Sequence, residues 1–319
     1  MIASGYAAPR EEETRLDTVE AVDALIANAQ PDPDLPERVD LHAHLPEGMR
    51  WPVRDQRHRG TCTAFAVTAG CEMLMAARTG EMLRLSPEYL YWRSREVAEG
   101  DLSDRPPQLA AGAVRLSDVR QAFERHGIAR DDLMPYDMTD ALYTERPPTP
   151  EADADAATRL FNGTGYDYGY KDEEPHGAAD AVRRALKDGQ PVALGLETFR
   201  MMADRDGGLS SCSNWQYAGA RNSGLIPGPR MQSMGVSTTV HSGHVVLVTG
   251  YVPGPEELGG SWFIFRNSWS CAFGRYPAAA RARWPGLPGQ GYGAVSAAYV
   301  EAFTIEYLAL SERETVPIA

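Results

Sequence analysis

An apolar stretch that opens on a cysteine restricts the fold more than any other feature. Residues 62–78 read CTAFAVTAGCEMLMAAR and predict a helix, in which Glu72 is the only charged residue between Cys62 and Ala77. A helix that is apolar nearly all round must be enclosed by protein. The chain has 319 residues, 43% hydrophobic and 24% charged, which is enough to build such a core.

The net charge restricts the partners of this protein. It is −13, and nucleic acids and anionic membranes repel a protein of this charge. No run of 18 apolar residues is present, so we expect no membrane span. The first residues, MIASGYAAPREEE, lack the positive start and apolar stretch of a secretory leader. We therefore expect neither nucleic acid nor membrane as a partner.

The four cysteines indicate a reducing compartment. Cys62, Cys71, Cys212 and Cys271 are scattered and form no CxxC pair, so neither a disulfide framework nor a zinc site is expected. In a helix, Cys62 and Cys71 would lie about 13 Å apart along the axis, too far for a disulfide. These features favour a cytoplasmic protein without a bound metal or other cofactor.

Helices come first along the chain and strands follow. Residues 1–45 form an acidic extension with one short amphipathic helix expected over residues 17–26. Further helices are predicted from Ser86 and Pro87 onward, over 116–127 and over 178–189. Short β-branched and aromatic segments at 191–199, 243–252, 261–269 and 303–310 predict strands. We expect an α+β protein with a helical lobe at 46–160, a strand lobe at 161–319 and a long polar connection over 200–240.

The cysteine that opens the apolar helix has two interpretations. The positive end of the helix dipole lowers the pKa of a thiol at this position and favours the nucleophilic thiolate. Free cysteines are also often buried as small apolar side chains, so Cys62 alone does not indicate catalysis.

A predicted hairpin brings a histidine and an asparagine together. His244 begins the strand HVVLVTGYV, and Asn267 follows the strand WFIFR. If the hairpin closes at Val252 and Ser261, Asn267 faces Val246, and His244 becomes its diagonal neighbour at about 7–8 Å between Cα atoms. A slip of one residue would place the two side chains on opposite faces. An asparagine beside a histidine can fix the orientation of the ring, as in Cys-His-Asn nucleophilic sites.

Six motifs in order resemble the papain family of cysteine peptidases. They are Gln56 six residues before Cys62, and then GTCTAF, LSPEYL, GIARDDLMPYD, GHVVLVTGY and RNSWSCAFG, which together span roughly residues 52–310. The resemblance implies a helical lobe and a β-barrel-like lobe with the active site between them. It also implies hydrolysis of peptide bonds through an acyl-enzyme thioester.

The resemblance assigns roles to individual residues. Cys62 would be the nucleophile, His244 the general base and then the acid, and Asn267 the residue that orients His244. Trp269 would shield that pair from water, and Gln56 would donate to the oxyanion beside the Cys62 backbone N–H. The family has a pair of glycines that binds the substrate backbone. The corresponding segment here reads AAGA, so Gly112 is the one residue to which this role carries over.

Several positions depart from the family pattern. Arg59 stands where many secreted relatives have a disulfide cysteine, which agrees with a reducing compartment. Thr63 replaces a usual Trp, Ser270 a usual Gly and Phe273 a usual Trp. None of these changes removes a catalytic group, but together they affect the expected efficiency and pocket shape.

Other hypotheses remain open at this stage. Asp40-x-His42-x-His44 resembles the first metal-binding strand of metal-dependent hydrolases, although the chain lacks their repeated strand–helix units. A papain-like protein that binds without catalysis is another, and transfer of the acyl group to an amine is a third. His241, three residues before His244, is an alternative general base.

Overall fold

The architecture is described from a computed structural model, which describes residues 34–99, 112–138, 146–167, 177–203, 208–228, 235–254, 260–275 and 288–313. The helix expected over 17–26 lies outside these residues. The described helices are η1 (Leu41–His44), α2 (Cys62–Thr79), α3 (Pro87–Glu99), α4 (Leu116–His126), α5 (Pro150–Ala156), α6 (Ala178–Lys187), α7 (Ala218–Ser223), η5 (Ser270–Ala272) and α9 (Ala297–Phe303). The strands are β1 (Val39–Asp40), β2 (Phe161–Asp167), β3 (Val192–Met202), β4 (Leu209–Ser213), β5 (Val236–Val252), β6 (Trp262–Arg266), β7 (Tyr292–Ser296) and β8 (Thr304–Glu312).

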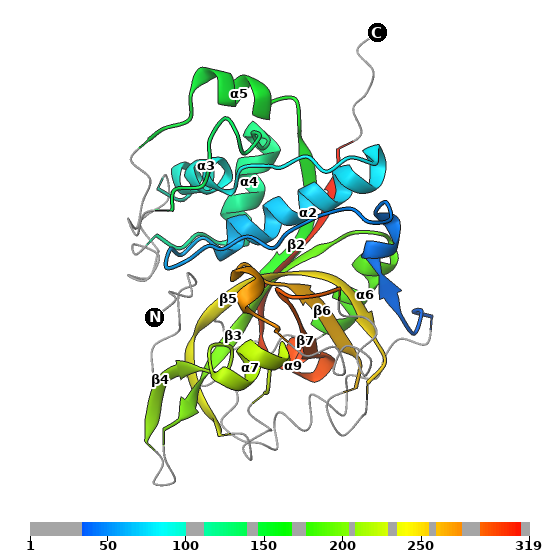
Figure 1. Cartoon of the computed structure of the whole chain (residues 1–319), viewed down its shortest axis with the longest axis vertical. Helices are drawn as coiled ribbons and strands as arrows, with labels where there is room; N and C mark the ends of the chain where they lie inside the picture. Colours follow the sequence, from blue (N-terminus) through cyan, green and yellow to red (C-terminus); the bar gives the residue numbers. More distant parts are fainter. Residues whose placement is uncertain are drawn as a thin grey trace.

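Helices α2 to α5 gather on one side of the molecule, as the upper half of Figure 1 shows. Helix α2 begins at Cys62, as the sequence predicts, and ends before Gly80, which takes a left-handed φ of 75°. Helix α3 begins at Pro87, and the Ser86 hydroxyl accepts a hydrogen bond from the Tyr89 N–H at 2.9 Å. The predicted cap and first residue of α3 are therefore confirmed.

The strands form one antiparallel sheet in the order β2-β8-β3-β5-β6-β7, with β1 paired to β5 and β4 paired to β3. Strand β5 is central, and its second half, Val245–Val252, is almost entirely apolar. Both faces of the sheet are covered there, which explains why the sequence does not alternate between apolar and polar residues.

The two faces of β5 belong to different cores. Val246 and Val248 lie in the strand core, which includes Leu194 and is closed by residues of α6 and α9. Val245 and Leu247 lie in a second cluster, the helix–sheet cluster, which also contains Cys62. In Figure 1, α2 runs across the top of the sheet at this junction. The apolar helix is enclosed because it lies between the helical lobe and the sheet.

The sequence predicts a long irregular connection over 200–240. This prediction is wrong in one respect, because much of the range is helix or strand. Strand β3 continues to Met202, β4 pairs back on it, and α7 follows. Strand β5 begins already at Val236. The segment Val236–Val240 reads VSTTV, and its β-branched residues extend the strand toward its N-terminal end.

Candidate active site

Cys62 is the first residue of α2 and is fully buried. The turn before it ends at Thr61, whose carbonyl accepts a hydrogen bond from the Phe65 N–H at 3.0 Å. Cys62 packs in the helix–sheet cluster with Val245, which directly follows His244. The thiol therefore lies at the positive end of a helix, where that helix meets β5.

His244 and Asn267 form the hydrogen bond that the hairpin predicts. The distance from His244 Nε2 to Asn267 Oδ1 is 2.9 Å, and both residues are buried. The Ser268 N–H donates to the same Asn267 oxygen at 2.8 Å. A backbone N–H can only donate, so this second bond identifies the atom as the carbonyl oxygen of the amide.

The direction of this bond determines the tautomer of His244. Since Asn267 Oδ1 only accepts, His244 Nε2 carries the proton, and in the neutral ring Nδ1 keeps its lone pair. Nδ1 is buried and has no hydrogen-bond partner among the described residues. Burial lowers the pKa of His244 to about 4, and the bond to Asn267 partly offsets that effect. The ring is a neutral base with one nitrogen unoccupied.

Two tryptophans hold the His244 ring in place. Trp269 stacks on it with 4.5 Å between ring centroids and 24° between planes. Trp215 meets it edge to face at 5.4 Å, and its Nε1 donates to the Tyr299 hydroxyl at 3.3 Å. The contact of Trp215 with His244 was not predicted from the sequence. The position of this aromatic residue in NWQYAG, within the long connection expected over 200–240, was the available signal.

The hairpin register agrees with the prediction at the site but not at the closed end. Leu247 faces Arg266, as expected, whereas Val252 faces Trp262 instead of Ser261. A bulge between Val248 and Gly250 shifts the pairing by one residue. The hairpin closes one residue away from the predicted position, and the bulge shifts the pairing back by one residue. His244 and Asn267 therefore lie on the same face, as predicted.

Gln56 is held from both sides of the junction between the lobes. Its side-chain Nε2 donates to the Arg59 carbonyl at 2.9 Å, and its Oε1 accepts from Ser268 Oγ at 2.5 Å. Its backbone N–H donates to the Ser268 carbonyl at 2.8 Å. The amide of Gln56 is therefore fixed next to the turn that leads to Cys62, and one of its two N–H donors remains for another acceptor.

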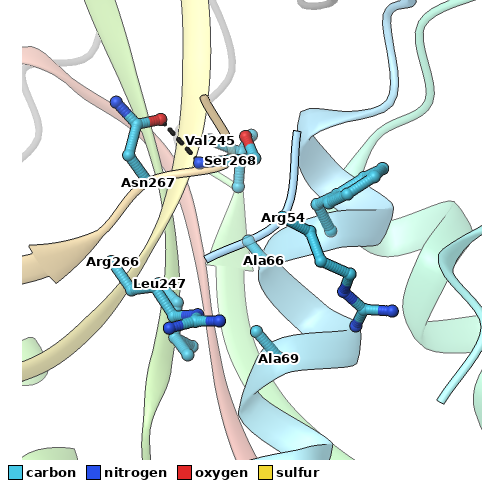
Figure 2. Close-up of a pocket in the computed structure, with 9 residues that line it drawn as sticks. Arg54, Ala66, Ala69, Val245, Leu247, Arg266, Asn267 and Ser268 are labelled. Atoms are coloured by element: carbon cyan, nitrogen blue, oxygen red, sulfur yellow. Dashed lines mark hydrogen bonds between the residues drawn. The ribbon is translucent and has the colours of Figure 1, made fainter. Parts of the chain in front are cut away.

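A small pocket next to Asn267 and Ser268 lies where α2 meets the sheet (Figure 2). It is lined by Arg54, Phe65, Ala66, Ala69, Val245, Leu247, Arg266, Asn267 and Ser268. Figure 2 shows Asn267 and Ser268 on the strand side and Ala66 and Ala69 on α2.

A partly buried ion pair joins the segment before Gln56 to α2 near this pocket. Arg54 Nη2 lies 2.6 Å from Glu72 Oε1, and Glu72 also accepts from Trp51 Nε1 at 2.8 Å and from the Leu85 N–H at 2.9 Å. Glu72 was the single charge in the predicted apolar helix, and these partners explain why a carboxylate can be buried there.

The other sequence-predicted residues lie in different surroundings. His241 is hydrogen-bonded to Ser242 Oγ and to the Ser211 carbonyl, so the bond to Asn267 belongs to His244. Gly112 has a left-handed φ of 94°, and its carbonyl accepts from the Tyr91 hydroxyl at 2.6 Å. That carbonyl is thus engaged within the protein.

The departures from the family pattern have structural roles. Thr63 Oγ1 donates to the Val114 carbonyl at 3.1 Å, and Phe273 packs edge to face on Trp269 with 5.7 Å between centroids. Ser270 takes a left-handed φ of 53° at the position where the family pattern has Gly. A side chain at such a φ is strained, so this substitution carries a conformational cost.

The Asp40-x-His42-x-His44 motif makes a hydrogen-bonded turn. His42 Nδ1 lies 3.1 Å from Asp40 Oδ1, and His42 Nε2 lies 3.1 Å from the Tyr292 hydroxyl. Both ring nitrogens are therefore engaged. Within the part of the chain that the structure describes, no group of three His, Cys, Asp or Glu residues could hold a metal ion.

Two wider findings bear on the sequence expectations. All four cysteines are free of disulfides. None of the helices within the described ranges is long and apolar enough to cross a membrane.

Comparison with known proteins finds similarity to papain-like cysteine proteases. The chain is 25% identical over 242 residues to Cathepsin L2 of Homo sapiens, a match covering 76% of this chain and 59% of that protein. It is 25% identical over 240 residues to the Probable cysteine protease RDL2 of Arabidopsis thaliana, covering 75% and 53%. The chain therefore spans between half and three fifths of the length of these relatives. No family model matches the chain.

Solved structures show the same architecture. Xylellain, a cysteine protease from Xylella fastidiosa, superposes with a TM-score of 0.60 at 18% identity, over 98% of both chains. The proform of the ragweed pollen cysteine protease Amb a 11 superposes with a TM-score of 0.54 at 17% identity, over 92% of this chain and 70% of that one. The two-lobed α+β fold and the resemblance to papain-like cysteine proteases are both confirmed.

Proposed function

We propose that the protein is a cysteine peptidase that hydrolyses peptide bonds through a thioester at Cys62. The hydrogen bond between His244 Nε2 and Asn267 Oδ1 carries this proposal, because it leaves Nδ1 as an unoccupied base on the strand that packs against α2. Cys62 begins that helix, where the dipole favours a thiolate. The relatives reported above support the same chemistry.

The proposed reaction begins with proton transfer from the Cys62 thiol to His244 Nδ1. The thiolate attacks the substrate carbonyl carbon, and a tetrahedral oxyanion forms. The Cys62 backbone N–H and the remaining Gln56 Nε2–H donate to that oxygen, and a preorganised donor of this kind is typically worth about 10²–10³ in rate. His244 then gives its proton to the leaving amine as the C–N bond breaks.

Hydrolysis of the thioester completes the cycle. His244 takes a proton from a water molecule, the resulting hydroxide attacks the thioester carbonyl, and Cys62 leaves as the thiolate. The same intermediate could pass to an amine, which would make the enzyme a transpeptidase. Asn267 keeps the ring oriented through both steps, and Trp269 excludes water from their hydrogen bond.

The proposal includes a substrate and a setting. The substrate is a peptide or protein, with Gly112 and Trp269 near its binding groove. The division into an extension at 1–45, a helical lobe at 46–160 and a strand lobe at 161–319 belongs to the same proposal. A reducing, cytoplasmic compartment would keep Cys62 as a thiol, which agrees with four cysteines outside disulfides.

The test is turnover of a fluorogenic peptide library by wild type, Cys62→Ala and His241→Ala proteins, with and without a chelator. We expect hydrolysis that Cys62→Ala abolishes, that His241→Ala retains and that the chelator does not change. Activity lost with the chelator and retained in Cys62→Ala would support a metal-dependent hydrolase instead. A folded wild type without turnover on any peptide would favour a non-catalytic binding protein.

A further inference from the structure

A buried ion pair lies beside the turn that leads to Cys62. Arg59 and Glu88 are each 1% exposed, and the guanidinium contacts both carboxylate oxygens, with Nη1 to Oε2 at 2.6 Å and Nη2 to Oε1 at 2.9 Å. The guanidinium also lies over the rings of Tyr91 and Tyr136, at 5.3 and 4.8 Å from their centroids. Burying such a pair gives little net stability, because desolvation offsets most of the attraction. The pair therefore adds little to the stability of the fold, and its main effect is to fix the positions of the segments that it joins.

The pair ties three separate segments together. Arg59 belongs to the turn before α2, and Glu88 lies in the first turn of α3. The third segment contains Asp137, whose carbonyl accepts from Arg59 Nη1 at 3.1 Å and whose N–H donates to Glu88 Oε2 at 3.0 Å. Loss of Arg59 would remove the side-chain bonds from the turn to both neighbours, and loss of the Glu88 charge would remove the bond to α3.

The same turn fixes the side chain of Gln56. The Arg59 carbonyl accepts the Gln56 Nε2–H at 2.9 Å, so the position of the Arg59 backbone sets the orientation of that amide. The Tyr136 hydroxyl donates to the Gln56 carbonyl at 2.9 Å and is bonded to Thr61 Oγ1 at 2.8 Å. Tyr136 is in turn held under the Arg59 guanidinium. Gln56 is therefore bonded to Arg59 through its side-chain amide, and to Tyr136, which lies under the Arg59 guanidinium, through its backbone carbonyl.

We propose that Arg59 and Glu88 are positioning residues for the oxyanion donor Gln56. This inference rests on the proposed function. In the family pattern, Arg59 stands where many secreted relatives have a disulfide cysteine, and a charge pair, unlike a disulfide, is insensitive to the reductants of a reducing compartment. The pair would hold the turn rigid under conditions in which a disulfide would be reduced.

A double-mutant cycle tests the proposal. One arm is Gln56→Ala, and the other is Arg59→Met combined with Glu88→Leu, which removes both charges and leaves none buried alone. We expect kcat/KM to fall by about 10²–10³ in Gln56→Ala and by about tenfold or more in the charge-free variant, with KM nearly unchanged. Combining all three changes should cost no more than Gln56→Ala alone.

Two further measurements separate positioning from general damage. A peptide aldehyde forms a tetrahedral adduct that uses the oxyanion donors, whereas iodoacetamide alkylates Cys62 without forming an oxyanion. The charge-free variant should bind the aldehyde at least about tenfold more weakly, in step with its loss of kcat, and be alkylated at the wild-type rate. The control is Arg93→Met with Asp153→Leu, which removes a more exposed ion pair between α3 and α5 and should change neither the aldehyde affinity nor the alkylation rate.

Several outcomes would overturn the proposal. Additive losses in the cycle would show that the pair does not act through Gln56, and equal losses of alkylation and turnover would show general disorder. If the charge-free variant does not fold, Glu88→Gln, which keeps one acceptor for Arg59, should still lower kcat and aldehyde affinity together. A wild type without Cys62-dependent turnover or aldehyde binding would overturn the proposed function itself, whereas an active wild type with an additive cycle would overturn only this inference.

Discussion

Removing the Asn267 side chain tests how strongly catalysis depends on the orientation of His244. In Asn267→Ala, the buried His244 Nε2–H loses an acceptor that lies at 2.9 Å. An unsatisfied buried donor costs about 1–3 kcal/mol, and the free ring can take the other tautomer, in which Nδ1 carries the proton. Since about 1.4 kcal/mol corresponds to a tenfold change in rate, we expect kcat/KM to fall by about 10- to 100-fold.

The matched variant is Asn267→Asp. Its carboxylate can accept the same hydrogen bond, and its charge raises the pKa of His244. We expect it to keep most of the activity with a displaced pH profile. The assay is steady-state hydrolysis of one fluorogenic peptide across pH, with thermal melts to verify folding. If Asn267→Ala stays within about twofold of wild type while folded, the role assigned to the His244–Asn267 bond is refuted.

Three further predictions concern stability. Ser270→Gly should raise the free energy of unfolding by up to about 1 kcal/mol in urea titrations, because it relieves a left-handed φ of 53°; no gain would contradict the strain. Glu72→Ala should lower it by about 1–3 kcal/mol, because the buried Leu85 N–H and the partly buried Arg54 guanidinium both lose an acceptor; a loss under about 0.5 kcal/mol would contradict this. In Cys62→Ala protein, which has no thiolate, burial holds the pKa of His244 near 4, below the ordinary value of 6.5. The unfolded chain then binds a proton that the folded protein does not, so stability should decrease as pH falls from about 6.5 to about 4, by about 3 kcal/mol in all. The same titration of a variant that also carries His244→Gln should lack this component.

Much of the fold follows from local patterns in the sequence. Cys62, Ser86 and Pro87 mark helix starts that the structure confirms, because caps and apolar periodicity act over a few residues. The strand Val236–Val252 was recognised only in its apolar half, because the polar residues between Ser237 and Ser242 interrupt the apolar pattern. Tertiary pairing with β3 extends it, and no local signal shows that pairing.

The candidate site was also predicted only in part, because some of its contacts join segments that are distant in the sequence. His244 and Asn267 could be paired through hairpin geometry, although the bulge after Val248 that makes the register correct was not foreseen. Trp215 approaches His244 from a segment distant in sequence, and no periodicity links the two. The partner of Arg59 was equally hidden, since only the folded helical lobe brings Glu88 to it.

The most direct test of the account is the reactivity of Cys62 compared with the other thiols. Native protein would be treated briefly with iodoacetamide at about pH 6, well below the pKa of an unperturbed thiol, and the modified cysteines identified by peptide mapping. Cys271 is exposed and serves as the internal reference. We predict that buried Cys62 reacts first, at least about tenfold faster than Cys271, and that His244→Ala abolishes this advantage. Modification of Cys271 first, or a Cys62 rate that His244→Ala leaves unchanged, would contradict an activated nucleophile.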